Sequence, residues 1–208
     1  MFDQAGGLTE IWRPLSALLL ASVVIMGSPG PSTVSATAIG AAFGIRRSLR
    51  YVGGLIAGTT AVLLAVAIGV VALVLAVPHA ATALGAVSVV YILYLAWQIA
   101  TARPLQTRDA TLPTPAFLGG FVLAIANPKA YLAIAAVFAG ATLLPASPSA
   151  DAVLKSALLT GMIVLIHLFW LLAGVWLSRL LHHPVQSRII NVALAVVLVV
   201  MTVLSFLG

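Results

Sequence analysis

The chain has 208 residues, of which 62% are hydrophobic and only 7% are charged, and its mean hydropathy is +1.20. Soluble domains carry about 25% charged residues, so this composition excludes a soluble protein and leaves no room for a separate soluble domain. The net charge of +6 would suit nucleic acid. The basic residues lie between apolar segments, however, where they orient membrane proteins, and we expect no nucleic-acid partner. Cysteine is absent, which excludes thiol redox chemistry and disulfides.

Charged residues divide the chain into apolar stretches of membrane-spanning length. In chain order these are residues 14–45, 51–102, 110–150 (which contain one charge), 156–178 and 189–208. One crossing needs about 20 residues, so the second stretch is predicted to hold two helices, divided at Pro78 and His79. The third is predicted to be one long helix with a loop at residues 145–148. The sequence thus predicts an all-α integral membrane protein with six transmembrane helices in a single domain, residues 1–208.

The basic residues are distributed unevenly between the predicted loops. Seven of the ten lie in the odd-numbered loops, and these are Arg46, Arg47, Arg50, Arg103, Arg108, Arg179 and Arg188. The positive-inside rule makes these loops cytoplasmic and places both termini outside the cytoplasm. The first ten residues contain Asp3 and Glu10 but no basic residue. A secretory signal needs a positive start, so we expect the first span to be retained.

Two short polar stretches with prolines interrupt the apolar segments. The first is Ser28, Pro29, Gly30, Pro31 and Ser32, and the second is Asn127, Pro128 and Lys129. Proline inside a helix removes a hydrogen bond and clashes with the preceding turn. Asparagine is a good N-cap and proline suits the first helical position, so new half-helices are predicted to begin at Asn127 and at Ser28 or Gly30. A simple kink at each proline is the alternative.

The start of each half-helix presents free amide donors and partial positive charge. If two such ends converge near the midplane, they form a site for a carboxylate. Lys129, about halfway along its predicted span, adds a charge that costs roughly 2.5–3.5 kcal/mol to insert. We therefore interpret all eight residues of the two stretches as substrate-binding. The alternative is that Lys129 snorkels to a surface or pairs with a backbone carbonyl.

The two halves of the chain share a pattern. Each begins with a proline-broken helix and continues with a glycine-bearing one. Three spans repeated once enter the membrane the second time with opposite orientation, so we predict two inverted three-helix repeats, residues 14–102 and 114–208. Small residues also recur every four positions, as is typical of closely packed membrane helices; they are Ser32, Ala36, Gly40 and Gly44, then Gly54 and Gly58.

His167 lies near the centre of the fifth predicted span. It could carry a proton near neutral pH, or it could equally be a hydrogen-bonded packing residue. No Asp or Glu lies within a predicted span, so proton coupling would fall to His167, Lys129 or the substrate. Trp170, in the same span, is interpreted as an interface anchor or a packing residue.

Two longer stretches surround the proline breaks: SPGPST followed by GAAFGIRRSLRYVGGLIAG, and FLGGFVLAIANPKAYL. With these stretches the chain resembles the LysE-type family of bacterial amino-acid exporters, which includes the homoserine and threonine resistance proteins. The resemblance implies a multi-pass secondary transporter of the inner membrane that exports amino acids or related small metabolites, driven by the proton gradient. Members commonly carry Asp or Asn directly after PGP, where this chain has Ser32.

Two other classes of protein are considered. A six-span metal-ion exporter would usually carry intramembrane carboxylates and cysteines, which are absent from the predicted spans. A membrane-embedded enzyme could use Ser32, Ser35 and His167 as nucleophile and base, but no carboxylate would orient the base. We therefore expect no enzyme activity, no metal site and no cofactor. The expected partners are a small-molecule substrate and membrane lipid, and a homo-oligomer is left open.

Overall fold

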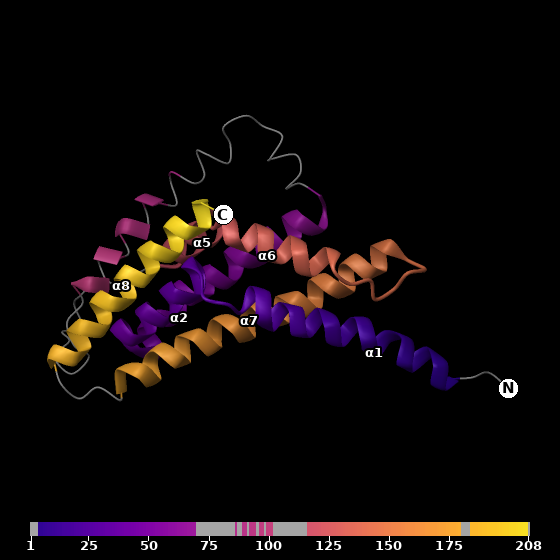
Figure 1. The fold of residues 1–208 in the computed structure, drawn as a ribbon, viewed down its shortest axis with the longest axis horizontal. Coiled ribbons are helices and arrows are strands. Elements are labelled where there is room, and N and C mark those ends of the chain that lie inside the picture. Colours follow the sequence, from indigo (N-terminus) through magenta and orange to yellow (C-terminus); the bar gives the residue numbers. More distant parts are fainter. Residues whose placement is uncertain are drawn as a thin grey trace.

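The computed structural model describes residues 4–69, 116–179 and 184–207, together with positions 86, 89–90, 92–94, 96–97 and 99–101. The bounded elements in these ranges are all helices (Figure 1), which confirms the all-α prediction for this part of the chain. They are α1 (Gln4–Ala21), a short π-helix η1 (Ser22–Met26), α2 (Pro31–Ala67), α5 (Phe117–Ile125), α6 (Pro128–Ala139), α7 (Pro148–Arg179) and α8 (Pro184–Leu207).

Two described helices are long and apolar enough to cross a membrane alone, α2 and, over Pro148–Ser178, α7. A third crossing results if α5 and α6, which are bent by 64° at their break, count as one span. The described residues thus support an integral membrane protein with two or three candidate spans. The predicted division at Pro78 and His79, and the predicted loop with Arg103 and Arg108, lie outside the described residues.

The first predicted span was expected to end at residue 45, and the helix is in fact broken by a kink at Gly44, one residue earlier. The kink divides α2 into an amino-terminal part, residues 31–43, and a carboxy-terminal part, residues 45–67, without a loop between them. Gly44 has φ 69° and ψ 175°, a left-handed conformation that glycine adopts without steric cost. The Ser48 hydroxyl donates to the Gly44 carbonyl at 2.6 Å. One glycine thus turns the chain where a loop was predicted.

The helix α7 begins earlier than predicted, at Pro148 rather than residue 156. It therefore includes Asp151 and Lys155 in its first two turns. Asp151 and Lys155 are only 5% and 6% exposed, and their side chains form an ion pair at 2.8 Å. The expectation that no carboxylate lies within a span is thus wrong for this helix, because α7 begins at Pro148, before the apolar stretch that was used to place the span.

The buried ion pair closes the loop between α6 and α7. Asp151 Oδ1 accepts the backbone N–H groups of Leu143 and Leu144 at 2.6 and 2.9 Å. Lys155 Nζ donates to the carbonyl of Phe138, in the last turn of α6, and to that of Ala141, in the loop that follows. The loop predicted at residues 145–148 therefore begins sooner, after Ala139, and the ion pair satisfies the backbone groups that it leaves unpaired.

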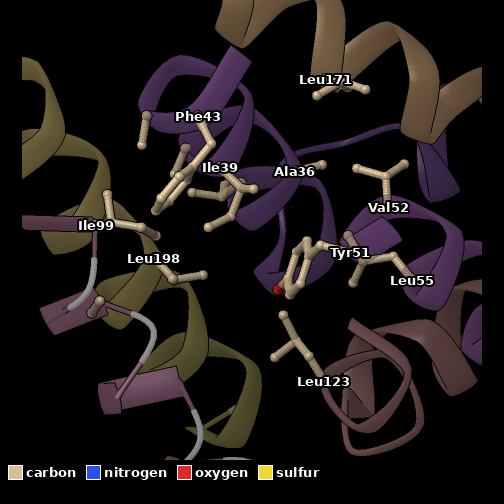
Figure 2. Close-up of a cluster of buried hydrophobic side chains, with 14 of the residues drawn as sticks. Ala36, Ile39, Phe43, Tyr51, Val52, Leu55, Ile99, Leu123, Leu171 and Leu198 are labelled. Carbon is tan, nitrogen blue, oxygen red and sulfur yellow. The ribbon is translucent and has the colours of Figure 1, made fainter. Parts of the chain in front are cut away.

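The centre of the fold is α2, which packs against α7 and α5 (Figure 1). A large apolar cluster joins these helices and α8; Figure 2 shows Tyr51 of α2 between Leu123 of α5 and Leu198 of α8, with Leu171 of α7 farther away in the same cluster. The close approach of α2 and α5 depends on glycine, because a β-carbon on Gly54 would collide with the backbone of α5. This contact agrees with the small-residue pattern of the sequence.

Candidate functional site

The first break follows the π-helix η1, which ends in a bond from the Gly27 N–H to the Ser22 carbonyl, 3.1 Å long. Residues 27–30 are then non-helical. Gly30 is the N-cap of α2, and its N–H donates to the Thr33 hydroxyl at 2.9 Å. Of the two starts predicted for this half-helix, Gly30 is the one observed, with Pro31 as the first helical residue. The break is thus two helix ends, rather than a simple kink.

The second break separates α5 from α6. Asn127 is the N-cap and Pro128 the first helical residue, as predicted. The Asn127 side chain makes no capping bond. Its amide nitrogen donates instead to the Ser32 hydroxyl at 3.0 Å. Because Ser32 lies in the first turn of α2, this bond joins two breaks that lie far apart in the sequence.

Lys129 makes the second connection between the breaks. Its ammonium donates to the Ser28 carbonyl and hydroxyl, both at 2.8 Å, and to the Pro29 carbonyl at 2.5 Å. A lysine ammonium has three protons, so all of its donors are used. Lys129 thus satisfies carbonyl groups at the first break. In this conformation it pairs with backbone carbonyls, as the alternative interpretation of Lys129 predicts.

Glycine at position 30 makes room for this contact. A β-carbon there would lie 2.7 Å from Lys129 Cδ and 2.9 Å from Nζ, closer than carbon atoms approach without displacement. Gly30 has φ −168°, an extended conformation open to any residue, so space rather than backbone geometry favours glycine here.

A small cavity of about 40 Å³ lies between the two breaks. Five of the eight predicted binding residues line it, and these are Ser28, Gly30, Ser32, Asn127 and Lys129. Pro29, Pro31 and Pro128 do not line it. The cavity also includes Thr59 of α2 and His167 of α7. A cavity of this size holds a few water molecules. We call this arrangement, in which the two breaks are hydrogen-bonded to each other, the closed conformation.

His167 and Thr59 contribute unpaired polar atoms to this cavity. His167 is 3% exposed; its Nδ1 lies 2.8 Å from the Ile163 carbonyl oxygen, and its Nε2 has no partner among the described residues. In the same part of the chain, the hydroxyl of Thr59 and Oδ1 of Asn127 are also buried without a partner. Sequence reasoning missed Thr59, because its position depends on how far α2 extends past the kink at Gly44.

Trp170 is more than an anchor or a packing residue. Its Nε1 donates to the carbonyl of Gly27, in the first break, at 3.0 Å. The Thr37 hydroxyl in turn donates to the Trp170 carbonyl at 3.1 Å. The signal for this role is that a broken helix leaves carbonyls that need donors, and an indole N–H is one of the few donors in the apolar stretch.

Within the described ranges no group of three side chains suited to a metal ion occurs. The site instead presents one ammonium, two half-helix starts and several buried hydrogen-bonding atoms in an apolar surrounding. Such a set suits reversible binding of a small polar molecule. A ligand could replace the present hydrogen-bond partners of some of these groups and could supply a partner to the others, which have none among the described residues.

Comparison with known proteins identifies relatives over nearly the whole chain. A family model described as LysE type translocator matches residues 23–207. A Salmonella typhimurium protein named cysteine/O-acetylserine efflux protein is 30% identical over 194 residues, which are 92% of this chain and 97% of that protein. A protein of the same name from Klebsiella pneumoniae is 30% identical over 185 residues, 89% of this chain and 93% of its own length. No solved structure gives a significant match.

Proposed function

The chain belongs to the LysE type translocator family, and on this premise we propose that it exports a small amino acid or related metabolite across the bacterial inner membrane. The observation that carries the proposal is the meeting of two proline-broken helices at one cavity. Broken helices whose ends face each other are the usual substrate sites of secondary transporters. The names of the relatives suggest a substrate of the cysteine and O-acetylserine class.

We assign the carboxylate end of the substrate to the region of Lys129 and the half-helix starts at Gly30 and Asn127. In the closed conformation Ser28 and Pro29 occupy all three donors of Lys129. A carboxylate that enters the widened cavity competes with these neutral oxygens, and a charged acceptor forms the stronger hydrogen bond. Substrate binding thus releases Lys129 from the first break and frees the two breaks to separate.

The direct test is export from cells. Cells that express the chain and cells that express an inactive variant are loaded with metabolites, and intracellular and medium pools are compared by mass spectrometry. We expect cysteine, O-acetylserine or a similar small amino acid to leave the expressing cells faster. If the cells gain tolerance to divalent metals and no amino acid leaves faster, the metal-exporter alternative replaces this proposal.

We further propose six spans in two inverted repeats with both termini outside the cytoplasm. The support is that each half contains a broken helix, a short half-helix after the break (residues 31–43 and α6), and then a long helix. A reporter fused after Gly208 is expected to be active only outside the cytoplasm, and one fused at Gln106 only inside. The opposite pattern would reverse the orientation and remove the basis for inverted repeats.

We propose His167 as the proton carrier that couples export to the proton gradient. The support is that its unpaired Nε2 lies in the wall of the cavity, where protonation and substrate binding affect each other. In reconstituted vesicles His167→Gln is expected to preserve flux down a substrate gradient, because glutamine keeps a hydrogen-bonding group. Uphill flux driven by a pH gradient is expected to disappear. If uphill flux continues undiminished, His167 is a packing residue.

A further inference from the structure

Three polar atoms of the cavity have no partner in the part of the chain that the structure describes: Thr59 Oγ1, Asn127 Oδ1 and His167 Nε2. Their residues are 6%, 4% and 3% exposed. They come from three different elements, the carboxy-terminal part of α2, the N-cap of α6, and α7. A buried polar atom without a partner destabilises a fold. Three of them around one cavity therefore indicate a ligand group that pairs with them.

The hydrogen bonds that these residues already make determine whether each unpaired atom can donate or accept a further hydrogen bond. A carbonyl oxygen only accepts, so His167 Nδ1 donates to Ile163 and, in the neutral ring, Nε2 carries a lone pair. Asn127 donates through its nitrogen to Ser32, which leaves the acceptor Oδ1 toward the cavity. The Thr59 hydroxyl can accept as well. The cavity thus offers two acceptors and one hydroxyl, and it requires a ligand group with several donors.

A primary ammonium has three N–H donors and no acceptor, and its charge strengthens each bond that it makes. We propose that Thr59, Asn127 and His167 form the subsite for the ammonium group of the exported substrate. This proposal rests on the proposed function, which supplies a substrate of the amino-acid class. With the carboxylate near Lys129, each charged end of the substrate then has a partner of suitable chemistry.

The opposite arrangement, with a carboxylate at the three atoms, fits the structure less well. The carboxylate would face the oxygen of Asn127, and two acceptors repel each other. It would also require a proton on His167 Nε2, which the neutral ring with its proton on Nδ1 does not carry. The three unpaired atoms therefore favour a cationic group over an anionic one.

The proposal gives a physical link between substrate and proton. Both a proton and a substrate ammonium need the lone pair of His167 Nε2, so binding of one excludes the other. The other charged residue in the described cavity wall is Lys129 of α6, and no carboxylate lines the cavity from α2, α6 or α7. Mutual exclusion at one atom makes the two binding equilibria depend on each other, which is what exchange across a membrane requires.

The experiment measures binding of three related probes to the purified full-length chain by calorimetry. L-Cysteine carries both charged groups, cysteamine only the ammonium, and 3-mercaptopropionate only the carboxylate. We expect Thr59→Val to weaken binding of cysteine and cysteamine about tenfold and to leave 3-mercaptopropionate unchanged, since one hydrogen bond to a charged group is lost. Thr59→Ser, which keeps the hydroxyl, is expected to bind like the parent.

Thr60→Val is the matched control, because Thr60 is adjacent in α2, only partly buried and not part of the cavity wall. Acidification supplies a second measurement. It is expected to weaken binding of cysteine and cysteamine to the parent, and this dependence is expected to be lost in His167→Gln. A residue with only a packing role would not change a pH profile for one probe class alone.

Several results would overturn the subsite proposal. If Thr59→Val weakens binding of all three probes equally, weakens binding of 3-mercaptopropionate alone, or changes the binding of none of them, the outcome contradicts an ammonium subsite. If the parent binds cysteine and 3-mercaptopropionate equally, the exporter proposal stands and the ammonium subsite is wrong. A parent that binds none of the three probes and exports no amino acid contradicts the proposed function and the subsite with it.

Discussion

The two proline breaks contain similar residues but contribute opposite halves of the hydrogen bonds between them. The first break provides acceptors: the carbonyls of Ser28 and Pro29 and the hydroxyls of Ser28 and Ser32. The second provides donors, the Lys129 ammonium and the Asn127 amide. The difference teaches that each break is incomplete alone, because in lipid neither water nor a regular helix satisfies these groups.

The complementarity also explains how the bonds that stabilise the closed conformation could be replaced when the two breaks separate. All the bonds between the breaks involve side chains of one break and oxygen atoms of the other, so they can be exchanged for bonds to a substrate without unfolding either half-helix. The comparison between the breaks is therefore tested best by substitutions that remove a donor, displace it, or remove an acceptor.

The largest effect is expected from Lys129→Met, which keeps length and apolarity and removes the ammonium. The substrate carboxylate loses its ammonium partner, and a loss of about 3 kcal/mol in the substrate complex would lower export about a hundredfold. Export of the identified substrate and the amount of inserted protein are measured together. Parental export at normal protein levels would assign Lys129 a structural role only.

A smaller effect is expected from Gly30→Ala, which displaces the donor without removing it. The new β-carbon would lie 2.7 Å from Lys129 Cδ, so the side chain moves away from Ser28 and Pro29. Export is expected to fall about tenfold, the equivalent of one charged hydrogen bond. The control is Gly161→Ala on α7, where a β-carbon meets nothing within 4 Å. Equal activity of the two variants would contradict the importance of the close fit.

The smallest effect is expected from Ser32→Ala, which removes the acceptor of the Asn127 amide. A neutral hydrogen bond contributes about 1 kcal/mol, so export is expected to fall about fivefold. Ser35→Ala is the control, because the Ser35 hydroxyl is equally buried but bonds within its own helix, to the Ser32 carbonyl at 2.8 Å. If Ser35→Ala is impaired as much as Ser32→Ala, loss of packing rather than loss of the connection is the cause.

The local features of the breaks were predictable from the sequence. Proline and asparagine determine where α6 begins through chemistry within a few residues of Asn127, and Pro31 does the same for α2. What Lys129 contacts was not predictable, because the sequence cannot show which carbonyls lie opposite a residue about a hundred positions away. The prediction of two converging half-helices therefore held, while the partner of the lysine needed the fold.

The helix boundaries show the same limit. Apolar stretches locate spans only as well as charged residues mark their ends. The kink at Gly44 lies one residue before the predicted end at residue 45, whereas α7 begins at Pro148, before its apolar stretch begins. The position of Thr59 in the cavity wall was not predicted either, because it depends on how α2 continues after the kink. The spacing of Asp151 and Lys155, four residues apart, is a signal that could have indicated their ion pair.

The ion pair at the start of α7 and Lys129 differ in how the membrane voltage acts on them. Lys155 is accompanied by the opposite charge of Asp151 at 2.8 Å, so a movement of that region carries almost no net charge across the bilayer. The hydrogen-bond partners of Lys129 are all neutral oxygens. One elementary charge that crosses the full potential gains or loses about 2.3 kcal/mol per 100 mV. A displacement of Lys129 along the membrane normal during opening therefore makes the conformational equilibrium sensitive to voltage, even when the exported molecule carries no net charge.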